Sequence, residues 1–158
     1  MGSAAWVKGS PVRTPGEDYP VFETDFGRVG MEICYDNFFP EVTRSLAVRG
    51  AEVICLPIAG DGRSGHYAYD IVARARAIDN AVFLVTSIWS PRSLIIDPEG
   101  HILADSAGRD TVITARVDLD ERPFCPWLSA RSAGCWKELL SLIHISEPTR
   151  LGMISYAV

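Results

Sequence analysis

A strand–helix–strand pattern near the start of the chain constrains the fold more than any other feature. Two short apolar runs, Arg28 to Cys34 and Ala51 to Leu56, flank Glu41 to Arg49, which suits a helix. Pro40 stands at the first helical position and Gly50 follows the last one, as is typical of a helix start and stop. A strand, a helix and a strand joined by short connections predict a βαβ unit with parallel strands and a right-handed crossover.

The rest of the sequence continues this α/β pattern. Glycine and proline punctuate short apolar runs, and one longer stretch carries apolar residues at helical spacing. Two pairs of adjacent runs predict β-hairpins, and Pro57 to Gly65 predicts a loop that leaves the second parallel strand. The predicted elements outside the βαβ unit are a helix at Tyr67 to Asn80 and strands at Val21 to Thr24, Ala81 to Ser87, Ser93 to Asp97, His101 to Asp105 and Thr111 to Asp118.

Composition and charge exclude several classes of function. The 158 residues are 47% hydrophobic and 22% charged, which is ordinary for one globular domain. The net charge is -5 and no basic run or basic-aromatic stripe occurs, so the sequence predicts no nucleic-acid partner. No apolar run approaches the roughly 18 residues of a membrane helix, and no charged-then-apolar leader opens the sequence. We therefore expect a cytoplasmic protein with no membrane partner.

The four cysteines, at positions 34, 55, 125 and 135, form no Cys-x-x-Cys pair and no spacing typical of a zinc site, so no metal is predicted. In a reducing compartment the thiols stay free, so each cysteine either packs in the core or takes part in a reaction. Cys55 lies inside an apolar run, whereas Cys34 ends one and is followed at once by Tyr35 and Asp36. Pattern alone leaves two interpretations of Cys34 open, inert core and reactive thiol, because free cysteine is often buried.

Cys34 also falls where α/β proteins bind ligands. The carboxyl ends of parallel strands meet at one edge of a sheet, and ligands usually bind outside that edge. The loop predicted from Pro57 would lie beside Cys34, and Tyr67, Trp89 and Arg92 are further candidates for lining a pocket there. A thiol at this place still needs a base or a cation to become a nucleophile at neutral pH.

Three longer segments carry a more specific signal. They are FGRVGMEICYDNFFPEVTRSLAVRGAEVICLP, RARAIDNAVFLV and SLIIDPEGHILADS, in that order, within about residues 15 to 120. Together they resemble the nucleophile segment and two later motifs of the carbon-nitrogen hydrolase (nitrilase) superfamily. The resemblance implies an α/β fold that is a fragment of an α-β-β-α sandwich, with a homo-oligomer in the full-length parent. It also implies hydrolysis of a non-peptide C–N bond in a small-molecule amide, N-carbamoyl or nitrile substrate, with no cofactor.

The resemblance gives four positions a place in the reaction. Cys34 would attack the carbonyl carbon and form a thioester. The backbone N–H of Tyr35 would help to hold the oxyanion, as donors at such a turn can. Asp36 and Pro57 would lie with Tyr35 on the oxyanion and substrate side.

Other positions are expected to support the turn rather than to react. Glu41 and Arg44, three apart on the predicted helix, would hold the turn under Cys34. Asp79 replaces the usual Glu of the family and is expected in an ion pair at a helix end. Glu32 lies two residues before Cys34 and is expected to take a packing or salt-bridge role.

Two catalytic groups of the family have no counterpart in this sequence. Members use a Glu as general base and a Lys that stabilises the oxyanion, both on segments before a Pro-Gly-x-x-x-Pro-Val-Phe run that begins here at Pro15. No Glu precedes Glu17, and Lys8 lacks the family's surroundings. We therefore expect that the N-terminal catalytic segments are missing, that Met1 is an internal start or a truncation, and that the chain is inactive by itself.

Three alternatives remain open at this point. A Cys–His pair would need His66, which opens the second predicted helix, or His101, which is expected to be solvated in a hairpin. An isochorismatase-like cysteine hydrolase also has a Cys at a strand end, although the Phe-Pro-Glu and Asp-Pro-Glu-Gly motifs argue against it. A non-catalytic nitrilase-like interaction domain would keep the fold without the base.

Residues 140–158 differ in character from what precedes them. Periodicity stops, and Pro148 interrupts any regular element. LSLIHISEPTR resembles the translation of a transposase adapter used in sequencing libraries, and Ile154 to Val158 resemble that of its companion primer. We expect an adapter-derived, non-native tail at 140–158 and a partial carbon-nitrogen hydrolase domain at 1–139.

Overall fold

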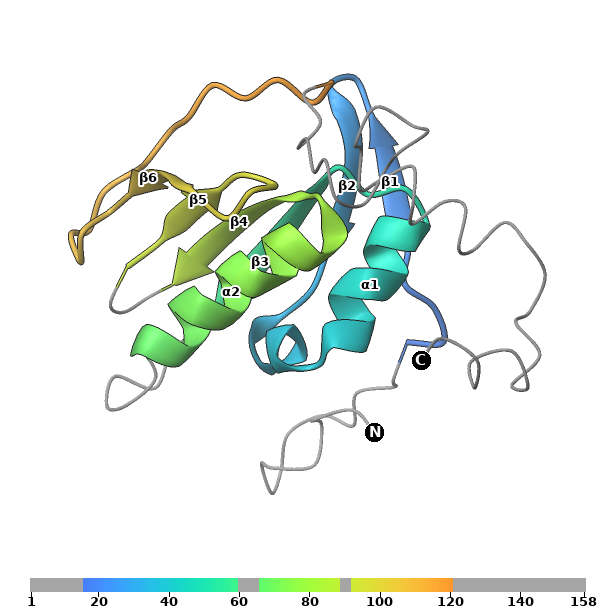
Figure 1. Cartoon of the computed structure of the whole chain (residues 1–158), viewed down its shortest axis with the longest axis horizontal. Coiled ribbons are helices and arrows are strands. Elements are labelled where there is room, and N and C mark those ends of the chain that lie inside the picture. The colour runs from blue at the N-terminus through green and yellow to red at the C-terminus, as the bar shows by residue number, and fades with distance from the viewer. Residues whose placement is uncertain (1–15, 60–65, 89–91, 121–158) are drawn as a thin grey trace, which may run out of the picture.

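A computed structural model of the chain describes residues 16–59, 66–88 and 92–120 (Figure 1). Within these ranges a six-stranded sheet runs in the order β1-β2-β3-β4-β5-β6, and two helices cover one of its faces. The elements are β1 Val21–Thr24, β2 Gly27–Met31, the 3-10 helix η1 Cys34–Phe38, α1 Pro40–Val48, β3 Val53–Ile58, α2 His66–Asn80, β4 Phe83–Ile88, β5 Leu94–Ile96 and β6 Ile102–Asp105.

The centre of the sheet is parallel and its flanks are antiparallel hairpins. Strands β2, β3 and β4 pair in parallel, whereas β1 pairs with β2, and β5 with β4 and β6, in antiparallel fashion. The predicted βαβ unit is therefore confirmed, and α2 adds a second crossover. Right-handed crossovers that advance in one direction along a sheet put their helices on one face, and α1 and α2 lie side by side there (Figure 1).

The core lies between the helices and the sheet. Ala73 and Ala77, four residues apart on α2, are both 0% exposed, so the helix approaches the sheet closely along this face. Leu84 in β4 is also 0% exposed. The cluster under α2 contains Leu56, Ile58, Ala73, Ala77, Leu84, Leu94 and Ile96, and the cluster under α1 contains Leu46, Ala47, Ala51, Ile54 and Val82.

Pro57 lies within a strand, which corrects the prediction that it opens a loop. The ladder between β3 and β4 continues through Pro57 and Ile58. Cys55, two residues earlier, accepts a hydrogen bond from the Glu32 N–H, so this side of β3 faces β2. Strand β2 has ended before Pro57, and the missing proline N–H therefore leaves no ladder bond unmade.

The strand predicted at Thr111 to Asp118 is wrong. Within the described residues this segment pairs with no strand, and it runs back across the end of the sheet towards β2 (Figure 1). Val112 is 89% exposed. Alternation of apolar residues is not enough for a strand, because a strand also needs a partner to pair with, and this segment pairs with none in the described ranges.

Some expectations concern residues outside the described ranges. These are the tail at 140–158, Lys8, Cys125 and Cys135, and the proposed pocket residue Trp89, so the structure does not test them. Of the helices within the described ranges, none has the length and hydrophobicity needed to cross a bilayer.

Shortening a buried side chain in the central strand β4 should destabilise the chain far more than shortening an exposed side chain in the edge strand β6. Leu84→Ala removes packing at a fully buried position and is expected to lower the free energy of unfolding by about 2–5 kcal/mol. Leu103→Ala, on β6, is the matched control: Leu103 is 43% exposed, and a change of about 0.5 kcal/mol is expected. Urea denaturation of both variants measures the difference. Equal losses would contradict the described core.

Candidate active site

Cys34 stands at a strained bend of the backbone. It follows β2 and begins η1, and its φ is 52°, in the left-handed region that non-glycine residues rarely adopt. Such a conformation costs roughly 1–3 kcal/mol and persists only where the surroundings hold it. The bend turns the chain from the end of a central strand into the short helix, and it presents the thiol at the carboxyl end of the sheet.

Asp36 closes this bend. Its Oδ2 accepts a hydrogen bond from the Ile33 N–H at 3.0 Å, while its own N–H donates to the Ile33 carbonyl at 3.0 Å. The Asp36 carbonyl in turn accepts from the N–H of Phe39 at 2.9 Å, where α1 is about to begin. The carboxylate that the sequence placed on the substrate side is thus used to hold the backbone of the turn around Cys34.

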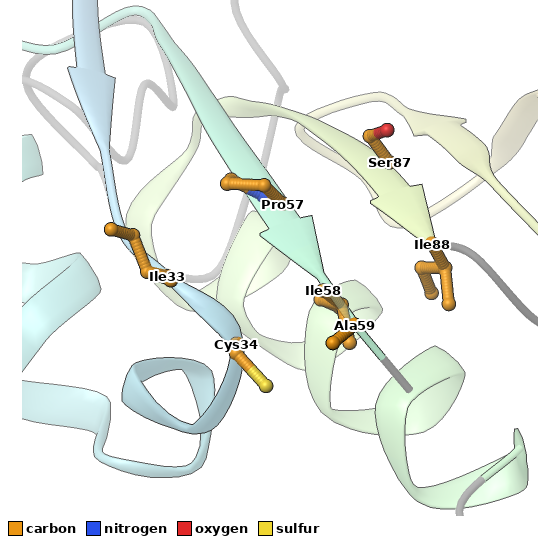
Figure 2. A pocket seen from close by; sticks show the side chains of 7 residues that line it. All are labelled: Ile33, Cys34, Pro57, Ile58, Ala59, Ser87 and Ile88. Carbon is orange, nitrogen blue, oxygen red and sulfur yellow. The ribbon is translucent and has the colours of Figure 1, made fainter. Parts of the chain in front are cut away.

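The thiol lies in a pocket formed where three strands end. The pocket has a volume of about 480 Å³, and Cys34 and Pro57 both line it, so the structure brings together two residues that the sequence assigned to the site. Except for Cys34 and Ser87, the lining side chains are apolar (Figure 2). They are Ile33 and Cys34 after β2, Pro57, Ile58 and Ala59 at the end of β3, and Ser87 and Ile88 at the end of β4.

Tyr35 points its ring outwards while its backbone stays in the turn. The ring is 56% exposed, stacks on Phe38 with centroids 5.3 Å apart, and meets the edge of Phe39 at 5.6 Å. The Tyr35 N–H belongs to the first turn of η1, where the backbone donors of a helix have no partner within that helix. The residue therefore offers a backbone donor next to the thiol, while its ring packs with those of Phe38 and Phe39.

Glu32 is a buried carboxyl behind the turn. Its side chain is 1% exposed and accepts a 2.7 Å hydrogen bond from the Thr43 hydroxyl of α1 at Oε2. Burial raises the pKa of the Glu32 carboxyl to about 7; nearby Asp36 raises this pKa further, while Thr43 and Arg76 lower it. The packing role expected for Glu32 is observed, with a hydrogen bond to Thr43 as its closest polar contact.

Arg76 joins α2 to the turn. Its Nε donates to the Asn37 carbonyl of η1 at 3.2 Å, and its Nη1 lies 3.4 Å from Asp79 Oδ2. Asp79 thus takes part in an ion pair at the end of α2, the place expected for it. The Asn80 side chain donates to the Arg76 carbonyl at 2.8 Å and fixes the last turn of the helix.

Glu41 and Arg44 are the residues of α1 expected to hold the turn under Cys34. Within the described residues no ion pair joins them: Glu41 is exposed in the first turn of α1, and Nη1 of Arg44 is buried without a hydrogen-bond partner. The described hydrogen bonds to the turn come from Asp36 and Arg76, and the support expected of Glu41 and Arg44 stays a prediction. The sequence assigned this support to α1, because the link through α2 depends on a packing that a linear pattern does not display.

Tyr69 was not singled out from the sequence, yet its hydroxyl lies 3.6 Å from Cys34 Sγ. The available signal was its helical spacing with Ala73 and Ala77, which puts Tyr69 on the sheet-facing side of α2. The expected neighbour Tyr67 has no described side chain, and His66 is described only as the first residue of α2.

Arg92 is held by two carboxylates rather than lining the pocket. Its guanidinium binds Asp70 on α2 and, at 2.8 Å, Asp105 on β6. This arginine therefore clamps the helix to the far hairpin of the sheet. These ion pairs give Arg92 a structural role, whereas the sequence suggested that it lines the pocket.

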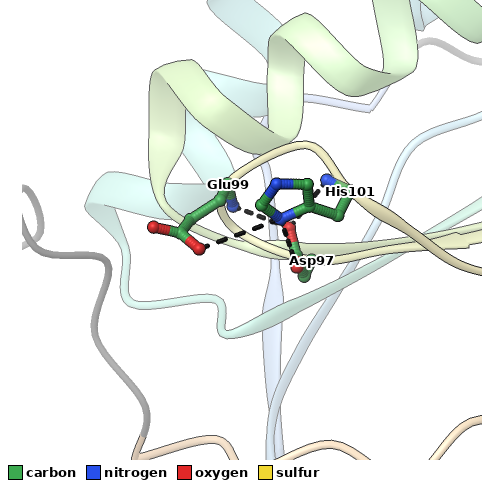
Figure 3. Close-up of side chains that lie close together, drawn as sticks. All are labelled: Asp97, Glu99 and His101. Carbon is green, nitrogen blue, oxygen red and sulfur yellow. Dashed lines mark hydrogen bonds and ion pairs between the residues drawn. The ribbon is translucent and has the colours of Figure 1, made fainter.

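The turn between β5 and β6 gathers Asp97, Glu99 and His101, whose potential ligand atoms lie within 4.8 Å of one another (Figure 3). Asp97 Oδ1 accepts from the N–H groups of Glu99 and His101, and Oδ2 lies 3.1 Å from His101 Nδ1. Glu99 and His101 are exposed, as expected for a solvated hairpin. These hydrogen bonds explain why the three side chains lie together: the Asp97 carboxylate stabilises its own turn.

The raised pKa of Glu32 predicts a pH-dependent stability. The pKa of the carboxyl is about 7 in the folded chain and 4.5 in the unfolded one, so the contribution of Glu32 to stability is fully present below about pH 4.5 and is lost as the pH rises through about 7. Glu32→Gln should therefore stabilise the chain by about 3 kcal/mol at about pH 8 and hardly at all at about pH 4. Thermal unfolding at the two pH values measures this. Glu23→Gln, at an exposed position of β1, is the control, and an equal gain at both pH values would contradict the interpretation.

The carbon-nitrogen hydrolase family matches residues 5–123, which include the whole of the described sheet and the pocket. The chain is 32% identical over 122 residues to omega-amidase NIT2 of Xenopus tropicalis and 32% identical over 120 residues to the chloroplastic omega-amidase of Arabidopsis thaliana. These matches cover 70% and 69% of this chain but 44% and 32% of the relatives, so the chain spans less than half of their length.

Solved structures agree with this assignment. Nit3 of Saccharomyces cerevisiae, a member of the nitrilase superfamily, matches with a TM-score of 0.57 and 30% identity over 63% of this chain and 40% of that protein. An amidase of the same superfamily from Nesterenkonia AN1 matches with a TM-score of 0.54 and 25% identity over 62% of this chain and 41% of that protein. The six-stranded α/β sheet is accordingly part of the nitrilase fold. The chain belongs to the carbon-nitrogen hydrolase family.

Proposed function

We propose that this chain carries the nucleophile of an amidase that hydrolyses the C–N bond of small amide or N-carbamoyl substrates. The observation that carries the proposal is the strained Cys34, held by its turn at the mouth of a pocket where three strands end. The similar Nesterenkonia amidase, 27% identical with a TM-score of 0.53, has an active-site cysteine to which acrylamide adds covalently. The omega-amidase relatives support an amide as the substrate class.

The reaction follows from the position of the thiol. The Cys34 thiolate attacks the carbonyl carbon, and the oxygen that gains charge is stabilised by the Tyr35 N–H at the head of η1. The C–N bond then breaks, the nitrogen leaves as ammonia or an amine after taking a proton, and an acyl thioester remains on Sγ. Water attacks this thioester, the acid departs, and the thiol is restored.

The general base and the oxyanion lysine that the family calls for are not found in the part of the chain described by the structure. Glu32 does not replace the base, because it is buried and bound to Thr43. No lysine occurs at the pocket within the same ranges. We therefore infer that the 158-residue chain by itself forms the nucleophile turn but does not turn over an amide.

The proposal also covers the boundaries of the domain in the sequence. We place the carbon-nitrogen hydrolase domain at residues 1–139 and the adapter-derived tail at 140–158. The family match over residues 5–123 lies inside the first of these ranges.

A non-catalytic interaction domain remains the second candidate function. Two observations favour it: the described residues contain no base beside Cys34, and the sheet face opposite the helices carries the exposed side chain of Met31. Membership in the carbon-nitrogen hydrolase family removes the isochorismatase-like alternative.

Cys34→Ala and Cys55→Ala separate the proposals. Both cysteines are half-buried, and burial raises the pKa of the Cys55 thiol. In the 158-residue chain, iodoacetamide should modify Cys34 faster than Cys55. In a chain extended upstream to include a Glu and a Lys, Cys34→Ala should abolish ammonia release from small amides, whereas Cys55→Ala should retain it.

Peptide mass spectrometry and an ammonia assay are the two measurements. An extended chain that releases no ammonia, together with a Cys34 that iodoacetamide does not modify, would overturn the amidase proposal and leave the interaction domain.

A further inference from the structure

We propose that Tyr69 is a further catalytic residue, whose hydroxyl donates a hydrogen bond to the Cys34 sulfur and holds it towards the pocket as a thiolate. This inference rests on the proposed function, since it concerns the same nucleophile. Oη of Tyr69 lies 3.6 Å from Sγ, a hydrogen-bond distance for sulfur, and both groups are partly buried. In the part of the chain that the structure describes, the hydrogen bond seen for the Cys34 side chain is the one to Tyr69.

Helix packing explains why the tyrosine reaches the thiol. Tyr69, Ala73 and Ala77 are spaced four apart and share the face of α2 that lies on the sheet. The two alanines are fully buried, so the helix axis lies close to the strands. A long side chain in the first turn of α2 then extends to the carboxyl ends of the strands. Cys34 and Tyr69 pack against the same core cluster.

The ring of Tyr69 is held by the nucleophile turn itself. Phe38, at the end of η1, meets the tyrosine ring at a centroid distance of 4.9 Å and an interplanar angle of 77°. Such an edge-to-face pair is worth about 0.5–1.5 kcal/mol beyond its buried area. Phe38 also stacks on Tyr35, so the turn that bends at Cys34 carries the aromatic side chain that orients its hydrogen-bond partner.

The direction of the hydrogen bond follows from chemistry. A thiolate has no proton and can only accept, so the Tyr69 hydroxyl must be the donor. Hydrogen bonds to an ionised acceptor are roughly twice as strong as neutral ones. The same donor serves when the thioester breaks and Sγ regains its charge. The hydroxyl proton stays on Tyr69 throughout, so no proton transfer is required of this residue.

The charged groups around the turn have other partners. Glu32, just after β2, is bound to Thr43, Asp36 on η1 to the Ile33 amide, and Arg76 on α2 to the Asn37 carbonyl and Asp79. Changes of pH in the neutral range can affect Glu32 because its pKa is about 7, so the test below compares variants that all retain Glu32.

Tyr69→Phe in the full chain is the test, with Tyr19→Phe as the matched control. Tyr19 is 41% exposed, its backbone N–H donates to Asp18 Oδ1, and it is not among the residues that line the pocket. The rate of iodoacetamide addition to Cys34, followed by peptide mass spectrometry, should fall about tenfold in Tyr69→Phe at about pH 7. The two proteins should converge at high pH, where the thiolate forms without help, and Tyr19→Phe should match the parent chain.

Incorporation of 3-fluorotyrosine at position 69 keeps the ring and its packing but makes the hydroxyl a stronger donor. At a pH below its own ionisation this chain should alkylate at Cys34 faster than the parent. This variant decides the matter if Tyr69→Phe fails to fold, because it differs by a single fluorine.

Each outcome bears on one proposal. Unchanged rate–pH profiles in both Tyr69 variants, with Cys34 reactive in the parent chain, would overturn the role of Tyr69 and leave the nucleophile intact. A parent chain whose Cys34 does not react would overturn the proposed function. A rate that falls by the same factor at every pH would show a purely structural role for the tyrosine and would also contradict this inference.

Discussion

The left-handed backbone of Cys34 is the constraint on which the candidate site depends. A side chain at φ 52° keeps this conformation only if neighbouring contacts hold both ends of the bend. Asp36 supplies one contact to the backbone just before the bend, and Arg76 supplies another to the carbonyl of Asn37 just after it. The turn is therefore held by one residue of its own, Asp36, and by Arg76 of α2, which lies far along the chain.

These contacts make the site a product of two crossover units rather than of one loop. Strand β2 and α1 deliver the thiol, and α2 delivers both the arginine that braces the turn and the tyrosine that meets the sulfur. The short side chains of Ala73 and Ala77 allow this, because they let α2 lie against the sheet. Stability of the core and orientation of the nucleophile thus share the same helix–sheet interface.

Much of the fold follows from local sequence, and much of the site does not. The hairpin strand at Val21–Thr24 and the helix that begins at Pro40 occur where apolar alternation and a proline start signal predict them. Cys34 was found because a strand ends at a polar turn. Tyr69 escaped prediction because its contact with sulfur depends on how closely α2 packs. The segment from Thr111 to Asp118 has the alternation of a strand but pairs with no other strand in the part of the chain that the structure describes, and alternation alone does not reveal that.

The position of Pro57 has a consequence for what can enter the site. Strand β3 extends past the end of β2, so one edge of its last residues is left without a neighbour in the described sheet. An unpaired edge normally invites an extended peptide to add itself as another strand. Proline at this place has no N–H to offer such a peptide. The strand edge that borders the pocket therefore offers an added polypeptide segment one backbone donor fewer than other residues would give it.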